Sequence, residues 1–171
     1  MGKKTDATLR EVQGFWNSPI LFWPVILISA SAWITFILKY FFNIILFNNI
    51  DTPRDLFGYL LLLGILFPLL FFLVTFTIEV RTGGVYFRFF PFHIRYKKIP
   101  FKSIAYYYPV NYSTISRFGG IGIRFNSRGE KIYNLGGNKG VEIGLTTGEK
   151  LVIGTNQDER LKKAIDQARF K

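Results

Sequence analysis

The chain has 171 residues and a mass of 19.8 kDa; 49% of the residues are hydrophobic, 18% are aromatic and the mean hydropathy is positive. This composition is too apolar for an ordinary soluble domain, so we expect part of the chain to lie in lipid. There is no cysteine and one histidine, His93, which excludes disulfides, thiolate metal sites and multi-histidine clusters. We predict no catalytic residue, no metal site and no cofactor. The net charge of +11 is interpreted first as an orientation signal.

The amino-terminal residues 1–17 are predicted to form a short interfacial helix. Leu9, Val12, Phe15 and Trp16 recur at helical spacing and give the segment one apolar face. Such a helix lies on the inner membrane surface or packs on the soluble domain, and the sequence leaves both placements open.

Two apolar runs in residues 18–78 are long enough to cross a bilayer. The first covers about 19–47 with a single lysine, and the second covers about 56–78 without any charge. At a rise of ~1.5 Å per residue, the second run exceeds a hydrocarbon core of roughly 30 Å. Pro24 and Pro68 are expected to kink these helices without breaking them. The runs therefore predict a transmembrane helical hairpin.

The distribution of basic residues predicts the orientation of this hairpin. Of the 22 basic residues, 17 follow residue 78 against 7 acidic residues, whereas the segment 48–55 carries only Arg54. Because lysine and arginine collect on the cytoplasmic side, we predict a multi-pass protein of the cell membrane with both termini cytoplasmic.

Residues 79–171 are predicted to form a cytoplasmic domain, because the hydrophobic period changes here from helical to alternating. About seven strands are expected, or eight if neighbours are split: 77–82, 85–90, 92–98, 103–109, 122–125, 131–135, 141–146 and 150–154. An amphipathic helix follows, with Asn156 as its N-cap and Glu159 as its capping-box partner. The fold class predicted is an α+β membrane protein, with a pleckstrin-homology-like (PH-like) antiparallel β-barrel or sandwich after the hairpin.

Several stretches carry a family resemblance. The most specific are Phe118-Gly119-Gly120-Ile121-Gly122-Ile123-Arg124 and Arg88-Phe89-Phe90-Pro91-Phe92-His93-Ile94-Arg95. The others are Glu11-Val12-Gln13, Ile99-Pro100, Gly140-Val141-Glu142 and Leu151-Val152-Ile153-Gly154-Thr155. Over nearly the whole chain, these stretches resemble an uncharacterised prokaryotic family of two-span membrane proteins with a cytoplasmic, bacterial PH-like domain. The resemblance implies the fold and the topology, and it implies no activity.

One basic cluster follows the second run closely and is the candidate site for lipid headgroups. Its members are Arg88, Arg95, Lys97, Lys98 and Lys102. Each basic side chain near an anionic surface contributes about 1 kcal/mol, so these five residues would hold the domain against the membrane. The alternative is that they are solvated strand faces that serve only the orientation bias.

Other motifs favour ordinary structural roles. The glycines around Asn138 lead into a strand rather than a helix, which indicates a hairpin turn instead of a phosphate loop. His93 lies among aromatic residues and has few partners for acid–base chemistry. The tyrosines 106–108 could stack on single-stranded nucleic acid, but membrane anchoring already explains the charge.

The sequence therefore predicts a non-enzymatic scaffold or interaction module at the inner membrane face. Its expected partners are membrane lipids and another protein or a second copy of the chain, without nucleic acid. The alternative function is an anionic lipid-headgroup sensor that uses the basic cluster.

Overall fold

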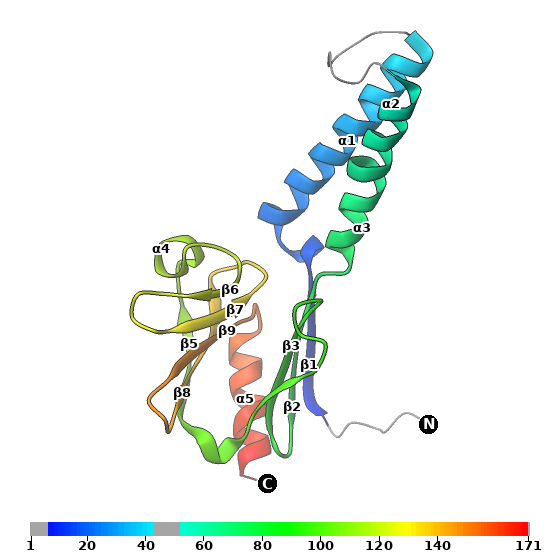
Figure 1. Ribbon diagram of the computed structural model, residues 1–171. Coiled ribbons are helices and arrows are strands. Elements are labelled where there is room, and N and C mark those ends of the chain that lie inside the picture. Colours follow the sequence, from blue (N-terminus) through cyan, green and yellow to red (C-terminus); the bar gives the residue numbers. More distant parts are fainter. Residues whose placement is uncertain (1–6, 43–51, 171) are drawn as a thin grey trace, which may run out of the picture.

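An apolar helical hairpin stands on a domain of two β-sheets in the computed structural model, which describes residues 7–42 and 52–170 (Figure 1). The first arm of the hairpin is α1 (Pro19–Phe42). The second arm runs through α2 (Pro53–Tyr59), the π-helical stretch η2 (Leu60–Leu66) and α3 (Phe67–Phe72). Residues 43–47 of the predicted first span, the predicted loop residues 48–51 and Lys3 and Lys4 lie outside the described residues.

The two arms pack against each other along one face and expose apolar side chains elsewhere. The buried residues of α1 are Val25, Ser29, Ala32 and Thr35, which recur at helical spacing on one face. Gly64 of η2 lies opposite Ala32, and a Cβ on Gly64 would be 3.6 Å from the Ala32 Cβ. Both arms are long and apolar enough to cross a membrane.

Pro68 lies near the start of α3, directly after the π-helical stretch. Proline cannot donate a helical hydrogen bond and its ring collides with the preceding turn. A local change of helix geometry before Pro68 accommodates the ring. The second arm continues past this point, as the sequence predicted for Pro68.

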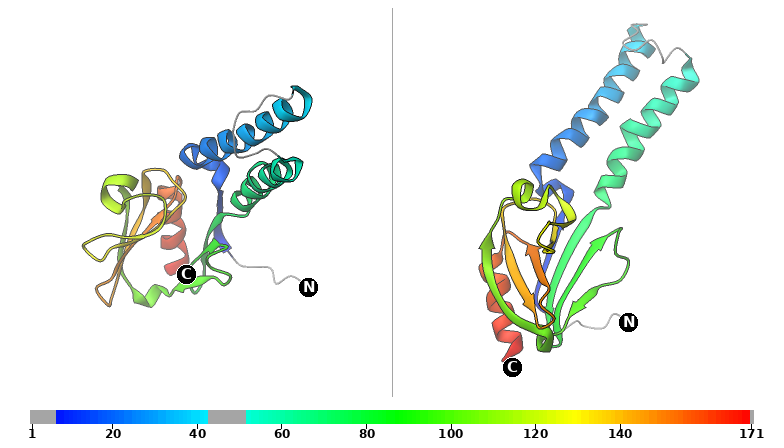
Figure 2. Two further views of the ribbon diagram at one scale, coloured as in Figure 1. Left: turned by 45° about the horizontal axis from the view of Figure 1, so that its top comes forward. Right: turned by 60° about the vertical axis from the view of Figure 1, so that its left-hand side comes forward.

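The four-stranded sheet, sheet A, is antiparallel and lies directly below the hairpin (Figures 1 and 2). In spatial order its strands are β1 (Ala7–Gly14), β2 (Thr75–Arg81), β3 (Gly84–Phe90) and β4 (Lys97–Ile99). The short 3-10 turn η1 (Phe15–Asn17) joins β1 to α1.

The predicted interfacial helix in residues 1–17 is therefore wrong for its described part, because residues 7–14 form β1. Glu11 and Gln13 face the inside of the domain, whereas Val12 is half exposed on the other face. In this strand the polar residues are buried and an apolar residue is exposed, so the usual alternation of buried apolar and exposed polar residues is not visible in the sequence. The predicted domain boundary after residue 78 is also displaced, because β2 already begins at Thr75.

The five-stranded sheet, sheet B, faces sheet A. In spatial order it comprises β5 (Ile104–Asn111), β8 (Lys139–Leu145), β9 (Lys150–Gly154), β7 (Lys131–Asn134) and β6 (Gly122–Phe125). The short helices η3 (Phe101–Ser103) and α4 (Thr114–Phe118) flank β5. Strands β7 and β9 pair in parallel, so the prediction of a wholly antiparallel arrangement is wrong at this pair.

The predicted strand 92–98 is reduced to the short strand β4. Pro91 has no backbone N–H for a ladder, and the next residues turn, with the His93 amide donating to the Phe89 carbonyl at 2.7 Å. As a result Phe92 and Ile94 are 71% and 80% exposed rather than buried on one strand face.

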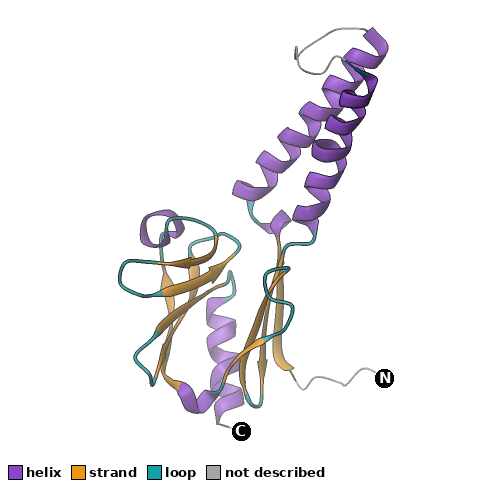
Figure 3. Ribbon diagram, in the orientation of Figure 1, coloured by secondary structure: helices purple, strands orange, loops and turns teal. Residues whose placement is uncertain are grey.

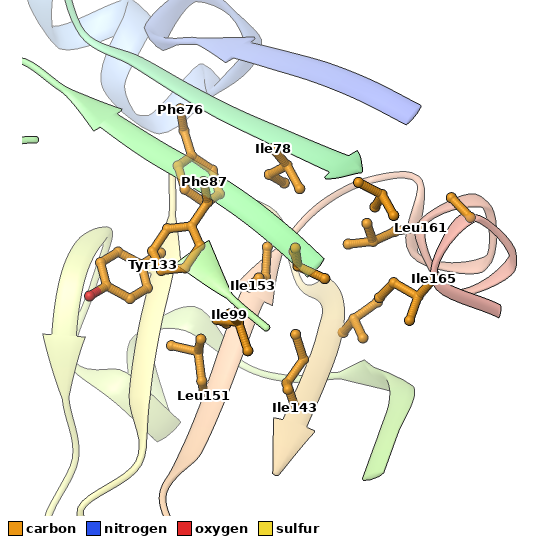
Figure 4. Close-up of a cluster of buried hydrophobic side chains, with 14 of the residues drawn as sticks. Phe76, Ile78, Phe87, Ile99, Tyr133, Ile143, Leu151, Ile153, Leu161 and Ile165 are labelled. Atoms are coloured by element: carbon orange, nitrogen blue, oxygen red, sulfur yellow. The ribbon is translucent and has the colours of Figure 1, made fainter. Parts of the chain in front are cut away.

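The helix α5 (Asp158–Arg169) lies between the two sheets and completes the core (Figure 3). Leu161, Ala164, Ile165 and Ala168 form its buried stripe, as the sequence predicted. Figure 4 shows Leu161 and Ile165 beside core residues of both sheets. The predicted N-cap is wrong: Gln157 occupies that position, and no side chain caps the helix.

Candidate functional site

The structure does not bring the five predicted basic residues together. Adjacent strand residues point to opposite faces, so Lys97 reaches the Tyr133 hydroxyl at 3.2 Å while Lys98 lies over the Tyr86 ring on the other face of sheet A. Lys102 is in η3, at the end of the domain farthest from the hairpin (Figure 1). Arg88, on β3, and Arg95, in the β3–β4 connection, lie toward the hairpin end of sheet A, and Lys97 pairs with Phe87, the neighbour of Arg88.

The outer face of sheet A, which points away from the core, is organised around the buried carboxylate of Glu79. Arg81 Nε donates to Glu79 Oε2 at 2.9 Å, the Tyr96 hydroxyl donates to Oε1 at 3.0 Å, and Arg10 Nε lies 3.4 Å from Oε1. Burial raises the pKa of Glu79, but these hydrogen bonds and the two arginine charges outweigh it, so the pKa is lowered overall. Glu79 is therefore ionised at neutral pH and serves as a structural anchor.

The Tyr96 ring covers part of this face and contacts two arginine side chains. The Arg81 and Arg88 guanidiniums lie 5.4 Å and 4.9 Å from the ring centroid. Arg88 Nε is buried without a hydrogen-bond partner among the described residues. The predicted headgroup residue Arg88 is thus partly engaged with aromatic rings.

His93 lies at the rim between the two sheets, near lysines from both of them. Burial lowers the pKa of His93, and the charges of Lys97 and Lys131 lower it further. The His93 ring lies 5.6 Å from the Tyr133 ring, and its Nδ1 has no hydrogen-bond partner in the described residues. Within the described part of the chain, no carboxylate forms a hydrogen bond or an ion pair with His93.

A buried polar tie fastens β1 to the start of α5. Gln13 Nε2 donates to Glu11 Oε1 at 2.8 Å and to the Gly154 carbonyl at 3.1 Å. Thr155 Oγ1 donates to Glu11 Oε2 at 2.5 Å and accepts the Gln157 amide at 2.9 Å. The tie satisfies polar groups that burial would otherwise penalise, and it fixes the strand that leads into the hairpin.

Phe15 joins the domain to the hairpin. Its side chain is fully buried, and its ring centroid lies 5.9 Å from Phe22 in α1 and 5.0 Å from Phe72 in α3. Because β1 runs into α1 and α3 runs into the strand paired with β1, the domain is connected to both arms at one place. The connections are short: α1 begins at Pro19, five residues after the end of β1 at Gly14, and β2 begins at Thr75, three residues after the end of α3 at Phe72.

A groove of about 800 Å³ opens between the first turn of α1 and the adjoining loops of sheet B. The exposed apolar residues Ile20 and Ile115 line it, with Leu21 and Ile121. Gly136 lies directly beneath the start of α1: a Cβ there would be 2.6 Å from Ser18 Oγ. The glycine-rich segments noted in the sequence thus form walls of one groove, a juxtaposition that their separation along the chain conceals.

The polar lining of the groove carries one charge. Arg124 Nε donates to the Ile121 carbonyl at 3.2 Å, and the guanidinium has no ion-pair partner among the described residues. Asn111 and Asn138 supply amide groups, and no aspartate or glutamate of residues 7–42 and 52–170 lines the groove. The site therefore offers hydrogen-bond donors and positive charge at one side of an apolar surface.

The outer face of sheet B, opposite α5, carries an ordered tyrosine pair. The rings of Tyr106 and Tyr108 stack at 5.8 Å between centroids and are 40% and 44% exposed. The Tyr108 hydroxyl donates to Glu142 at 2.8 Å, and Arg117 holds the other Glu142 oxygen at 2.9 Å. The hydrogen bond to Glu142 is the main reason that the pKa of Tyr108 is raised. We call this surface the tyrosine face.

These features describe an α+β protein with two helices apolar enough to cross a membrane, two open sheets and a terminal helix. Within the described residues, no group of three or more histidine, cysteine or acidic side chains could hold a metal ion. The profile of the Family of unknown function (DUF6141) matches residues 2–170, and the chain belongs to that family. No significant match was found among curated proteins or solved structures.

Proposed function

We propose that this protein is a two-span membrane protein whose two-sheet domain is a non-enzymatic interaction module at the cytoplasmic face. The observation that carries the proposal is that β1 and β2 continue into the two arms of the hairpin while they pair with each other. This connection fixes the orientation of the domain relative to the bilayer. With its orientation fixed, the domain presents the same surfaces to every partner that diffuses in or along the membrane.

The architecture of the proposed module is PH-like in plan. Two sheets packed around the terminal helix α5 support this assignment, and the parallel β7–β9 pair departs from it. Neither sheet closes, so β5, which carries Tyr106 and Tyr108 of the tyrosine face, remains an edge strand. Partly exposed tyrosines are enriched in protein interfaces because their rings bury area at little entropic cost.

Topology is tested by single-cysteine labelling, since the native chain has no cysteine. Arg54→Cys and Phe170→Cys place thiols at exposed positions near the hairpin tip and the carboxyl end. We expect a membrane-impermeant maleimide to label the Arg54→Cys variant in intact cells and the Phe170→Cys variant only after permeabilisation. The opposite pattern, or extraction of the protein by alkaline carbonate, contradicts the proposed topology.

The interaction role is tested by photo-crosslinking from the tyrosine face. A benzophenone amino acid in place of Tyr106 should give one discrete adduct, with a protein partner or with a second copy of the chain. The matched control carries the same group at Phe125, which is 65% exposed on the edge strand β6. Equal crosslinking at both positions, or none at either, would refute the tyrosine face as the contact surface.

A second candidate function, contact with anionic lipid headgroups, is favoured by the β3–β4 connection. Phe92 and Ile94 are highly exposed there, beside Arg88 and Arg95, and β3 ends opposite Thr75, close to the end of α3. Apolar tips flanked by basic side chains are typical of membrane-surface contacts.

This second candidate is tested in the full chain, because residues 79–171 alone lack β1 and the start of β2. An environment-sensitive fluorophore on Ile94→Cys in nanodiscs containing phosphatidylglycerol should be shielded from an aqueous quencher. The same label on Phe170→Cys is the exposed control. Equal quenching at the two positions rules out insertion of this loop.

A further inference from the structure

We infer that the groove at the base of α1 is a binding site for a single anionic phospholipid from the adjacent leaflet. The inference rests on the membrane insertion proposed above and adds a ligand class and a site. None of the five predicted basic residues lines the groove.

The position of the groove selects a lipid over a soluble ligand. Ile20 and Leu21 belong to the first turn of α1, so in an inserted hairpin they lie where the hydrocarbon region begins. Ile20 is 64% exposed and Ile115, on the opposite wall, is 70% exposed. An acyl chain entering from the leaflet would cover both side chains without leaving the hydrocarbon boundary.

The charge of the groove selects an anionic headgroup. The Arg124 guanidinium lies near Gly120, where a Cβ would be 3.9 Å from Arg124 Nη2. Its Nη groups make no hydrogen bond to the described protein, and Asn138 supplies a further side-chain amide. A guanidinium pairs with phosphate oxygens through two parallel N–H donors.

The walls of the groove are held in place by contacts that a ligand does not need to form. Thr114 Oγ1 donates to the Gly137 carbonyl, and the Tyr112 amide donates to the Asn138 carbonyl at 2.8 Å. Gly136 and Gly137 have φ angles of +122° and +84°, which favour glycine over other residues. The groove is thus built before binding, which reduces the entropic cost of association.

The test measures retention of phosphatidylglycerol by the full-length protein in detergent, using native mass spectrometry during a lipid titration. We expect one lipid to bind more tightly than the rest, and Arg124→Gln to weaken that site roughly tenfold to a hundredfold. The matched control is Arg128→Gln, an exposed residue outside the groove with the same change of charge. Ile115→Gln, also exposed, should weaken the site through its apolar wall.

Three outcomes would overturn the inference. An equal loss of phosphatidylglycerol binding in the Arg124→Gln and Arg128→Gln variants would mean that the lipid is held by general electrostatic attraction. Equally tight binding of phosphatidylcholine would mean that the groove does not distinguish an anionic headgroup from a zwitterionic one. Displacement of the lipid by millimolar inorganic phosphate would mean that the groove binds phosphate without the acyl chain. Carbonate extraction of the same variants separates these results from a failure of membrane insertion, which would contradict the proposed function instead.

Discussion

Replacement of Phe15 by alanine is expected to uncouple the domain from the hairpin. The Phe15 side chain is fully buried between β1 and the two arms, with Phe22, Phe71 and Phe72 around its ring. Removal of a buried phenylalanine ring typically costs about 3–5 kcal/mol, through lost burial and the cavity that remains. We expect the lower part of that range, because lipid or the arms can partly fill the cavity.

The assay is hydrogen exchange of the β1 amides in the full-length protein in nanodiscs. Since each 1.4 kcal/mol is a factor of ten, opening of β1 should become on the order of 10²- to 10³-fold more frequent in Phe15→Ala. Amides in the hairpin arms should change little, because their hydrogen bonds are made within each helix. The exchange pattern therefore distinguishes local detachment of β1 from global unfolding.

The matched control for this deletion is Phe170→Ala, which removes the same ring from a position that is 82% exposed. Surface substitutions of this kind usually change stability by no more than about 0.5 kcal/mol. If Phe15→Ala leaves β1 protection within the range of Phe170→Ala, then Phe15 does not couple the domain to the hairpin.

Three further substitutions test the polar and backbone features of the domain. Glu79→Gln should lower the free energy of unfolding at neutral pH by about 1.5–3 kcal/mol. Because the pKa of Glu79 is lowered in the folded state, the carboxylate stabilises the fold fully above its unfolded pKa, and this stabilisation is lost as pH falls through the folded pKa. The melting midpoint of the variant should therefore change less between about pH 7 and about pH 3 than that of the parent protein. Gly84→Ala should destabilise sheet A, since φ is +143° and a Cβ would collide with the Ile99 carbonyl. In thermal melting followed by circular dichroism, its midpoint should be lower than that of the control Gly58→Ala, because a Cβ at Gly58 meets open space. Thr155→Val should cost about 1–3 kcal/mol by removing a partner of the buried Glu11 carboxylate, and unchanged melting would show that the tie contributes nothing.

The parts of the fold that were predicted correctly depend on local pattern. The helical runs are visible because both faces of each arm are apolar over some twenty residues. The strands 122–125 and 150–154 match β6 and β9, because turn residues bound them closely. The buried stripe of α5 follows directly from helical spacing around Leu161 and Ile165.

The parts that were missed depend on contacts between distant residues. The strand β1 carries two polar residues on its inner face, and only the partners around Thr155 make that burial tolerable. The parallel pairing of β7 with β9 is a matter of sheet order, which alternation along one strand does not encode. For the same reason no local pattern connects the glycines of the groove with the first turn of α1.

The predicted basic cluster shows how far proximity along the chain can mislead. The prediction grouped Lys97 and Lys98 in one cluster, although adjacent strand residues point to opposite faces, and the structure places the two side chains on opposite faces of sheet A. Arg124, by contrast, lies in a segment noted for its glycines, and its charge becomes informative only when the groove is seen.

The topology links insertion of the hairpin to completion of the domain. Strands β1 and β2 are antiparallel neighbours, and the chain between them is the whole helical hairpin rather than a short turn. Bringing the two ends of so long a connection together in an unstructured chain carries an entropic cost. Two paired helices avoid this cost, because the end of α3 then lies next to the start of α1. Formation of both arms therefore lowers the entropic cost of bringing together strand β1, its polar tie to α5 and the wall of the groove at Ile20. In an inserted protein, formation of the hairpin would thus favour assembly of the domain surfaces that lie next to it.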